Sequence, residues 1–275
     1  MIKLRFHNSI GEVSFEAGKW HLTAAEGLTL PQKLISAVRY INQPGQKVTS
    51  CVEKARTITL SGDVNLKILG IGEISRACSI LGKEGILTVE TERFVRRINA
   101  RCIEFVPGDR KGHYRTFVVQ FLCDIPFFED EEYTTTAIYK KIPKLSRDTV
   151  LPAVFSERIA KGDIHYTGSA YAEPIIYLDM PEGSGLLEII NRTTGNSIKL
   201  SYDSSLYKKL IIDTKERRIT DENGTDRVEI LTDDSFFDGF CIVAGENIIE
   251  VINSDQIADV TVLLKYKVRY QEAVV

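Results

Sequence analysis

The feature that most constrains the fold is a strict two-residue repeat near the end of the chain. Between residues 260 and 270, apolar or aromatic side chains occupy every second position, and Lys265, Lys267 and Arg269 lie between them. The repeating positions are Val260, Val262, Leu264, Tyr266, Val268 and Tyr270. A repeat of two places successive side chains on opposite faces of a strand. The pattern therefore predicts a half-buried β-strand whose three basic residues face outwards.

The same repeat recurs in the first half of the chain. Residues 2–7 alternate Ile2, Leu4 and Phe6 with polar residues, and residues 117–123 place four apolar side chains on one face. Turn sequences separate further short strands, as at residues 181–185 (PEGSG), 194–196 (TGN) and 222–225 (ENGT). Short strands joined by such turns are typical of antiparallel sandwiches and barrels. The sequence thus predicts a mainly β fold.

One short helix is expected within residues 72–82. Ile74, Ala77, Cys78 and Leu81 follow the spacing of one helical face, and Gly82 is placed for a left-handed C-terminal cap. Residues 33–42 fit a second helix, but residues 38–41 (VRYI) read equally well as a strand.

Two domains are predicted, residues 1–130 and residues 131–275. The strand pattern lapses between residues 129 and 149, where the acidic run 129–132 precedes a stretch rich in Thr and Lys. The first part holds 18 Lys/Arg and 14 Asp/Glu, whereas the second holds 17 and 24. This contrast favours two units with different partners. It is too weak to indicate nucleic-acid binding.

The composition indicates a globular protein without a membrane segment. Hydrophobic residues make up 43% and charged residues 27% of the chain, and no apolar run approaches the roughly 20 residues that cross a bilayer. The first residues lack the continuous apolar core of a secretory signal. The five cysteines are odd in number and show no Cys-x-x-Cys spacing. They are expected to be reduced and mostly buried, in a protein made in a cytoplasm.

The sequence around Gly70 and Gly72 superficially matches a dinucleotide-binding loop. It follows a strand-like segment and opens the expected helix, and Glu90 lies about 20 residues later, where a ribose-binding acid would stand. However, Ser75 replaces the third glycine, and no further strand–helix units follow. The segment is therefore interpreted as a turn into a helix.

Other candidate sites also lack the spacing that their chemistry needs. Residues 221–226 resemble a calcium loop, but the glycine falls at position 4 and Thr232 at position 12, so a hairpin turn is preferred. Ser184 lies outside any Gly-x-Ser-x-Gly elbow. No histidine has a partner at metal-ligand spacing: His7, His21, His113 and His165. We expect no catalytic, cofactor-binding or metal-binding residue, no cofactor, and no enzymatic activity.

Four arginines form a local basic cluster: Arg93, Arg96, Arg97 and Arg101. Only Phe94 is interleaved, which is a thin platform for stacking bases. A solvated or inter-subunit face is preferred to a nucleic-acid site. Trp20 is the only tryptophan, which weakens a sugar-binding role for the second half, although Tyr166, Tyr171 and Tyr177 remain available.

An ordered set of segments resembles the siphovirus distal tail family. Residues 56–62 (RTITLSG) resemble an early strand of that family, and residues 123–128 (CDIPFF) resemble the segment that closes its first domain. The second half carries further segments in the expected order: 191–195 (NRTTG), 211–214 (IIDT), 218–224 (RITDENG), 234–237 (DSFF) and 244–247 (AGEN). Residues 163–180 depart from the family pattern, since 168–174 read GSAYAEP.

The resemblance implies a structural hub of the tail tip or baseplate of a phage or prophage. It implies a ring, usually hexameric, of N-terminal belt domains, residues 1–130, each carrying a galectin-like β-sandwich, residues 131–275. Such a ring joins the tail tube protein to the tail-associated lysin or tail fibre and lets DNA pass, and a receptor-binding protein is a further candidate partner. The expected location is the virion tail tip, after synthesis in the bacterial host cytoplasm. Neither tight nucleic-acid binding nor a membrane partner is expected. The alternative function is a carbohydrate-binding β-sandwich module for adhesion to the host surface.

Overall fold

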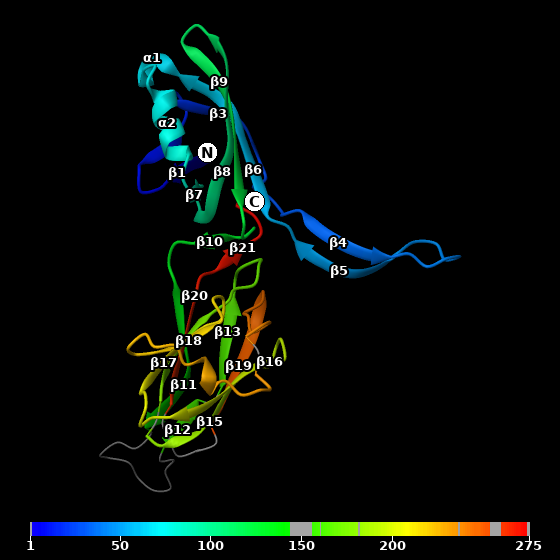
Figure 1. The fold of residues 1–275 in the computed structure, drawn as a ribbon, viewed down its shortest axis with the longest axis vertical. Helices are drawn as coiled ribbons and strands as arrows, with labels where there is room; N and C mark the ends of the chain where they lie inside the picture. The colour runs from blue at the N-terminus through cyan, green and yellow to red at the C-terminus, as the bar shows by residue number, and fades with distance from the viewer. Residues whose placement is uncertain are drawn as a thin grey trace. The chain divides into compact units, whose positions relative to one another are not determined.

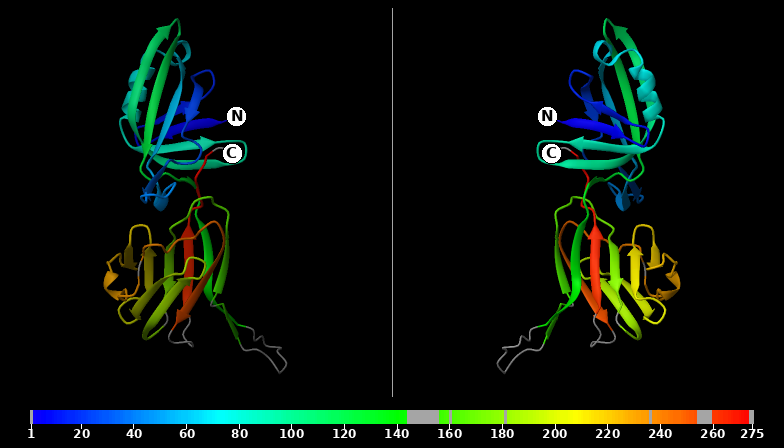
Figure 2. Two further views of the ribbon diagram at one scale, coloured as in Figure 1. Left: turned by 90° about the vertical axis from the view of Figure 1, so that its right-hand side faces the viewer. Right: turned by 90° about the vertical axis from the view of Figure 1, so that its left-hand side faces the viewer.

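The computed structural model describes residues 2–143, 156–159, 161–180, 182–235, 237–253 and 260–273. The protein is mainly β, as predicted, and forms two compact units (Figures 1 and 2). Unit 1 comprises Met1–Glu131 with Tyr270–Val275, and unit 2 comprises Glu132–Arg269. Pro181 of one predicted turn, Phe236 of one family-like segment, and residues 144–149 of the predicted lapse lie outside the described residues.

The last residues of the chain belong to unit 1, whereas the sequence had placed them in the second domain. The Tyr270 ring lies 3.7 Å from the guanidinium carbon of Arg96, and its hydroxyl donates to Asp130 at 3.1 Å. These contacts hold the chain end against unit 1. The predicted lapse after residue 130 is also partly wrong, because β11 occupies Thr134–Pro143.

Unit 1 is built on a nine-stranded antiparallel sheet with the order β2-β1-β7-β8-β9-β6-β3, to which β10 and β21 are attached. The strands are β1 (Lys3–His7), β2 (Glu12–Phe15), β3 (Trp20–Glu26), β6 (Arg56–Asn65), β7 (Gly85–Glu90), β8 (Val95–Lys111), β9 (Tyr114–Cys123), β10 (Phe128–Asp130) and β21 (Arg269–Tyr270). Leu4, Phe6 and the four alternating residues of β9 are buried, which confirms the strand facing predicted for both segments. Ile2, in contrast, is exposed.

Two α-helices occur in unit 1, where the sequence predicted one. The short α1 (Leu66–Leu69) precedes the predicted α2 (Glu73–Leu81). The buried face of α2 is rotated from the prediction, because Glu73 and Ile80 are buried whereas Cys78 is exposed. The indole Nε1 of Trp20 donates to the Glu73 carboxylate at 3.1 Å, which draws this charged residue inward. Gly82 has a φ of −67°, so the predicted left-handed cap is wrong.

Because the Glu73 carboxylate is buried and hydrogen-bonded, we expect the stability of unit 1 to fall at acid pH. Burial raises its pKa, but hydrogen bonds from Arg76 and Trp20 outweigh burial and hold the pKa below the usual value. Because the folded-state pKa is depressed, this stabilisation is present above the unfolded pKa and is lost as the pH falls through the folded pKa. We expect Glu73→Gln to unfold at lower urea than the wild type at neutral pH. The difference should shrink as the pH falls through the folded-state pKa of Glu73.

Fluorescence of Trp20, the only tryptophan, measures this transition. A stability gap between wild type and Glu73→Gln that stays constant from neutral to acid pH would contradict the assignment.

Unit 2 is a sandwich of a six-stranded and a four-stranded antiparallel sheet, with the orders β12-β11-β20-β14-β17-β18 and β13-β19-β15-β16. The remaining bounds are β12 (Ser156–Ile159), β13 (Lys161–Tyr166), β14 (Ile175–Asp179), β15 (Ser184–Asn191), β16 (Asn196–Asp203), β17 (Lys209–Asp213), β18 (Arg218–Asp221), β19 (Gly245–Asn253) and β20 (Thr261–Tyr266), with a 3₁₀ helix η1 (Val228–Ile230). Tyr166 of β13 and Tyr266 of β20 join the sheets, with ring centroids 5.8 Å apart.

The strand predicted from the C-terminal repeat is β20, and its facing is confirmed at Val260, Val262, Leu264 and Tyr266, which are all buried. The prediction fails at Arg269, which is also buried. The strand ends at Tyr266, so the alternation no longer sets the facing. The Arg269 guanidinium pairs with Glu173 at 3.0 Å, and its backbone N–H donates to the Tyr166 hydroxyl at 2.7 Å.

Candidate functional site: surfaces for assembly

A two-stranded hairpin extends away from the nine-stranded sheet of unit 1 (Figure 1). It consists of β4 (Lys33–Val38) and β5 (Lys47–Glu53), which pair only with each other among the described strands. We call residues 33–53 the arm. This segment was ambiguous in sequence and is a strand at residues 33–38. Every side chain of both strands is exposed except Glu53, which is half-buried.

The arm presents apolar side chains on both faces. Leu34 lies opposite Val52, and Ile35, on the other face, lies opposite Cys51. At the tip, Ile41 is 91% exposed. An isolated hairpin is marginally stable in water at best, and contiguous exposed apolar side chains mark interaction surfaces. The arm therefore has the character of a segment that becomes covered by another chain.

The outer face of the sheet formed by β8, β9, β6 and β3 is largely uncharged. Thr57, Thr59 and Ser61 of β6 lie opposite Leu122, Gln120 and Val118 of β9 in successive rows, and all six are exposed or half-exposed. Acidic side chains flank these rows: Glu104 pairs in register with Gln120, and Asp63 with Thr116. Arg101 of β8, in register with Leu122, is a cation of this face and pairs with Glu84. The six residues of the rows themselves offer hydroxyl, amide and aliphatic groups.

Both borders of this four-stranded segment are open among the described residues. β3 pairs with β6 only, and residues 104–111 of β8 pair with β9 only. Unpaired strand edges present free backbone N–H and C=O groups, which are ready to pair with another chain.

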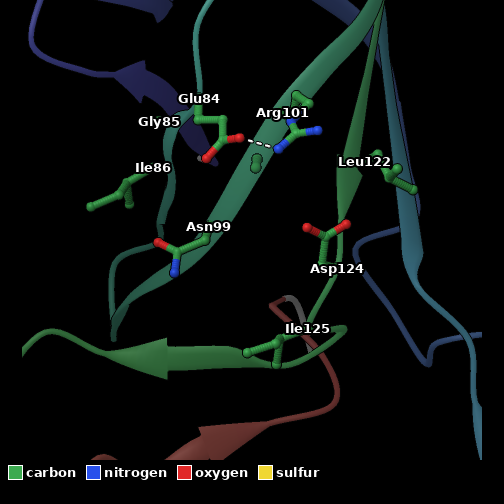
Figure 3. A pocket seen from close by; sticks show the side chains of 9 residues that line it. Glu84, Gly85, Ile86, Asn99, Arg101, Leu122, Asp124 and Ile125 are labelled. Carbon is green, nitrogen blue, oxygen red and sulfur yellow. Dashed lines mark hydrogen bonds and ion pairs between the residues drawn. The ribbon is translucent and has the colours of Figure 1, made fainter. Parts of the chain in front are cut away.

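A groove of about 470 Å³ lies where β8 changes its partner from β7 to β9 (Figure 3). Ile86, Leu122 and Ile125 give it apolar walls, and Asp124 points into it. Glu84 and Arg101 form an ion pair along one side. The lining contains no Ser, Cys or His, so it offers no nucleophile with a base. The groove has the mixed apolar and acidic chemistry of a docking surface.

The arginine cluster is mostly neutralised within unit 1. Arg97 pairs with Glu131 at 2.8 Å, and Arg101 pairs with Glu84. Arg96 is buried, although a solvated or inter-subunit position was predicted. Its guanidinium carbon lies over two aromatic rings, 4.1 Å from the Phe94 centroid and 3.7 Å from that of Tyr270.

The sequence segments considered for cofactor or metal chemistry form turns and ion pairs within the chain. Gly70 has a φ of +85° and ends α1, so the glycine-rich segment is a turn between helices. Glu90, in β7, pairs with Arg5 at 3.3 Å. Among the described residues, no group of three or more His, Cys, Asp or Glu is placed to hold a metal ion. No helix of the described part of the chain could span a membrane.

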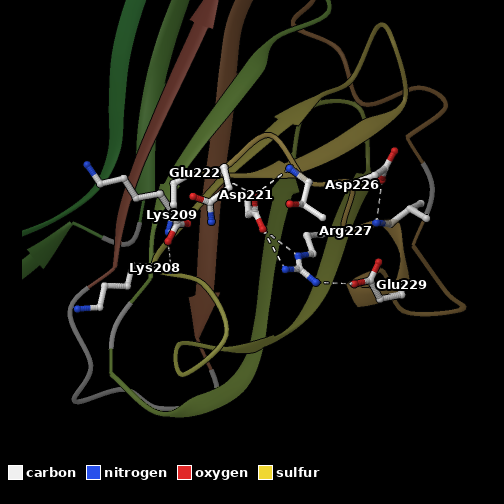
Figure 4. A network of polar contacts seen from close by, with 10 residues as sticks. Lys208, Lys209, Asp221, Glu222, Asp226, Arg227 and Glu229 are labelled. Carbon is white, nitrogen blue, oxygen red and sulfur yellow. Dashed lines mark hydrogen bonds and ion pairs between the residues drawn. The ribbon is translucent and has the colours of Figure 1, made fainter.

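The candidate calcium loop is a turn organised by a buried aspartate (Figure 4). The Asp221 Oδ1 accepts backbone N–H groups of Asn223 and Thr225, both at 2.9 Å, and its Oδ2 accepts from Arg227 at 3.0 Å. Burial raises the Asp221 pKa, but these donors outweigh burial and lower it. A carboxylate occupied by three donors of its own chain serves as a turn cap.

Family-like segments of unit 2 share this capping role. Asn191, which is fully buried, accepts the backbone N–H of Thr193 at 2.9 Å and donates to the Cys241 carbonyl at 2.7 Å. Asn247, also fully buried, accepts from the Val243 N–H and donates to its carbonyl. These polar residues satisfy backbone groups in turns.

The cysteines and tyrosines differ in part from expectation. All five cysteines are free, as predicted, but Cys51 and Cys78 are exposed, so the burial predicted for most of them is wrong. Burial raises the pKa of Cys123 to about 12, which makes it an inert thiol. Tyr166, a candidate sugar platform, is buried in the core, whereas Tyr171 is exposed and Tyr177 is half-buried.

Sequence reasoning missed the arm and a buried arginine at its root, Arg56. The arm carried a weak signal, since residues 33–53 hold exposed apolar side chains without the polar alternation of a half-buried strand. Arg56 carried none, because its partners are backbone carbonyl groups.

Residues 167–270 match the family model described as the siphovirus-type tail component, C-terminal domain. No curated protein matches the chain. The crystal structure of SPP1 Dit, described as a paradigm of the hub adsorption apparatus in phages that infect Gram-positive bacteria, matches with a TM-score of 0.68 at 13% identity, covering 97% of this chain and 99% of that chain. A chain of the phage P2 baseplate in its activated conformation with Ca matches with a TM-score of 0.46 at 13% identity, covering 96% and 98%. The resemblance to the siphophage distal tail family is thereby confirmed, and the match to SPP1 Dit shows the fold.

Proposed function

We propose that this protein is a structural hub of a siphophage tail tip. The proposal is supported by the match of residues 167–270 to a siphovirus-type tail component and by the fold shared with SPP1 Dit. The protein acts by assembling with copies of itself and with other tail proteins. It is a virion component, made in the cytoplasm of the infected bacterium, and catalysis is no part of its role.

The arm is the observation that carries this proposal. An exposed hairpin that is apolar on both faces gains stability only when another chain covers it. The open borders of the β8-β9-β6-β3 segment provide a second means of contact, because strand pairing can continue from copy to copy. Contacts between unlike surfaces of identical chains generate a ring when the rotation closes. We propose a ring, hexameric as the family resemblance implies, formed through unit 1.

Unit 1 is thus the belt domain of the hub, and unit 2 is its galectin-like sandwich. The ring joins the tail tube protein on one side to the tail-associated lysin or tail fibre on the other. A receptor-binding protein is a further candidate partner for unit 2. The different charge of the two chain halves supports different partners, since the first half carries an excess of Lys/Arg and the second an excess of Asp/Glu.

Light scattering of the full chain over a wide concentration range tests the hub. We expect a single assembly with the mass of a small closed oligomer. A monomer that persists at the highest concentrations would contradict ring formation.

DNA passage predicts weak DNA binding. Each phosphate neutralised by Lys or Arg adds salt-dependent affinity, so a basic channel would retain its cargo. The outer face of β8, β9, β6 and β3, which we propose faces the channel, has uncharged rows flanked by Glu104 and Asp63, and its Arg101 is paired with Glu84. We expect no tight binding of duplex DNA at near-physiological salt, measured by fluorescence anisotropy.

Arg93→Glu with Arg97→Glu serves as the diagnostic variant, because both side chains reach the surface whereas Arg96 is buried. Sub-micromolar affinity that weakens steeply with salt and disappears in this variant would show a nucleic-acid site instead of a passive channel.

A further inference from the structure

One buried guanidinium connects the root of the arm to the end of the chain. Arg56, the first residue of β6, is 3% exposed. Its Nε donates to the carbonyl oxygen of Pro126 at 2.7 Å, and its Nη1 donates to those of Gly27 and Thr29. Its Nη2 donates to the carbonyl oxygen of Gln271. Three separate segments therefore share this side chain: the link between β3 and the arm, the loop after β9, and the chain end.

The chemistry of this position suits arginine and no other side chain. A guanidinium directs five N–H donors in a fixed plane, so it can serve carbonyl groups on several sides at once, whereas a lysine ammonium is a compact point charge. The guanidinium carbon also lies 4.8 Å from the centroid of the Phe128 ring. Burial lowers the pKa of Arg56 to about 10, which still leaves it charged at neutral pH.

Further contacts hold the chain end against the root of the arm and against β8. The backbone N–H of Ala273 donates to the carbonyl oxygen of Leu28 at 2.8 Å, and both residues are buried. Arg96 contacts the ring of Tyr270 and pairs with the Glu272 carboxylate at 3.3 Å. Each of residues 270–273 is thus held by a contact within unit 1. The contact of Ala273 with Leu28 is at the root of the arm.

The root of the arm is also closely packed against β6. Gly27 has a φ of +83°, and a Cβ atom there would lie 2.2 Å from the carbonyl oxygen of Thr57. The segment that leads into the arm is therefore pressed against β6 and covered by residues 270–273.

We propose that residues 270–273 and Arg56 form a clasp that fixes the root of the arm and so presents the arm for assembly. The effect on assembly rests on the proposed function, whereas the fixing of the root is a property of unit 1 alone. Without the clasp, the root segment opens locally, and an arm with a free root loses orientation before it meets another copy. Ordering it again on contact costs conformational entropy.

Hydrogen exchange of the full chain, at a concentration too low for assembly, tests the clasp. In Arg56→Lys, which keeps the charge, we expect peptides covering residues 26–32 to exchange about tenfold faster or more than in the wild type. Peptides from the centre of β9 should be unchanged. The matched control is Arg101→Lys, which alters an exposed ion pair and should leave residues 26–32 unaffected. Unaltered exchange at residues 26–32 in Arg56→Lys would overturn the clasp.

A second variant covers the case in which Arg56→Lys does not fold. Deletion of residues 271–275 removes the Gln271 and Ala273 contacts and keeps Arg56, and the same acceleration is expected. Light scattering then separates the two claims. A wild type that never assembles refutes the proposed function while exchange still decides the clasp. Variants that lose the protection of the root and yet assemble as well as the wild type would refute the role of the clasp in assembly.

Discussion

Replacing Leu264 by lysine is expected to unfold unit 2 or bring it close to unfolding. Leu264 is fully buried in β20, between β11 and β14. An unpaired charge in such a position costs several kcal/mol, against a total stability of about 5–15 kcal/mol for a typical protein. Val262→Lys should behave in the same way, because Val262 is on the same buried face.

The single tryptophan can show whether the loss of structure is confined to unit 2. Trp20 lies in the core of unit 1, so its fluorescence should stay native while circular dichroism shows the loss of β-structure in unit 2. The control is Lys265→Ala, on the opposite face of the same strand, which removes a contact with the Tyr133 ring. That change should cost about 1 kcal/mol at most. Equal melting temperatures for Leu264→Lys and Lys265→Ala would show that the facing of β20 is wrong.

Charges placed on the arm are expected to abolish assembly without affecting the fold. Leu34 and Ile41 are strongly exposed, so Leu34→Asp with Ile41→Asp should change the stability of the separate chain by about 0.5 kcal/mol or less per site. If the arm is covered in the ring, each buried contact that is lost should cost about 2 kcal/mol or more. The loss is repeated at every interface of the ring, so light scattering should report a monomer.

The matched control carries the same chemical change on exposed apolar residues away from the arm. Ile71, 74% exposed between α1 and α2, and Leu206, 67% exposed in unit 2, become aspartate. This control should assemble as the wild type does. Equal assembly by the arm variant and the control would show that the arm makes no contact between copies.

Much of the fold could be predicted because one face of each strand is buried within the chain. Phe117 to Cys123 and Val260 to Tyr266 alternate because every second side chain packs in a core. The prediction fails where one specific bond decides. Trp20 draws Glu73 into the core and rotates α2, and Glu173 holds Arg269 inside after β20 has ended. Neither partner is close in sequence, so local periodicity contains no trace of it.

The candidate surfaces were less predictable for a different reason. The arm has apolar side chains on both faces, because nothing in the described part of its own chain divides them into a buried and a solvated set. The clasp consists mainly of hydrogen bonds to backbone carbonyl groups, which every residue possesses. The family-like segments were easier to recognise, since buried turn caps such as Asn191 and Asn247 require particular side chains at particular positions.

Electron microscopy of the purified full chain shows whether unit 1 closes a ring. We expect closed rings with a central opening, hexameric as the family resemblance implies, in which the arm of each copy contacts its neighbour. Particles of Leu34→Asp with Ile41→Asp should be single chains under the same conditions. Single wild-type chains at every concentration, or assemblies held together through unit 2, would refute ring formation through unit 1.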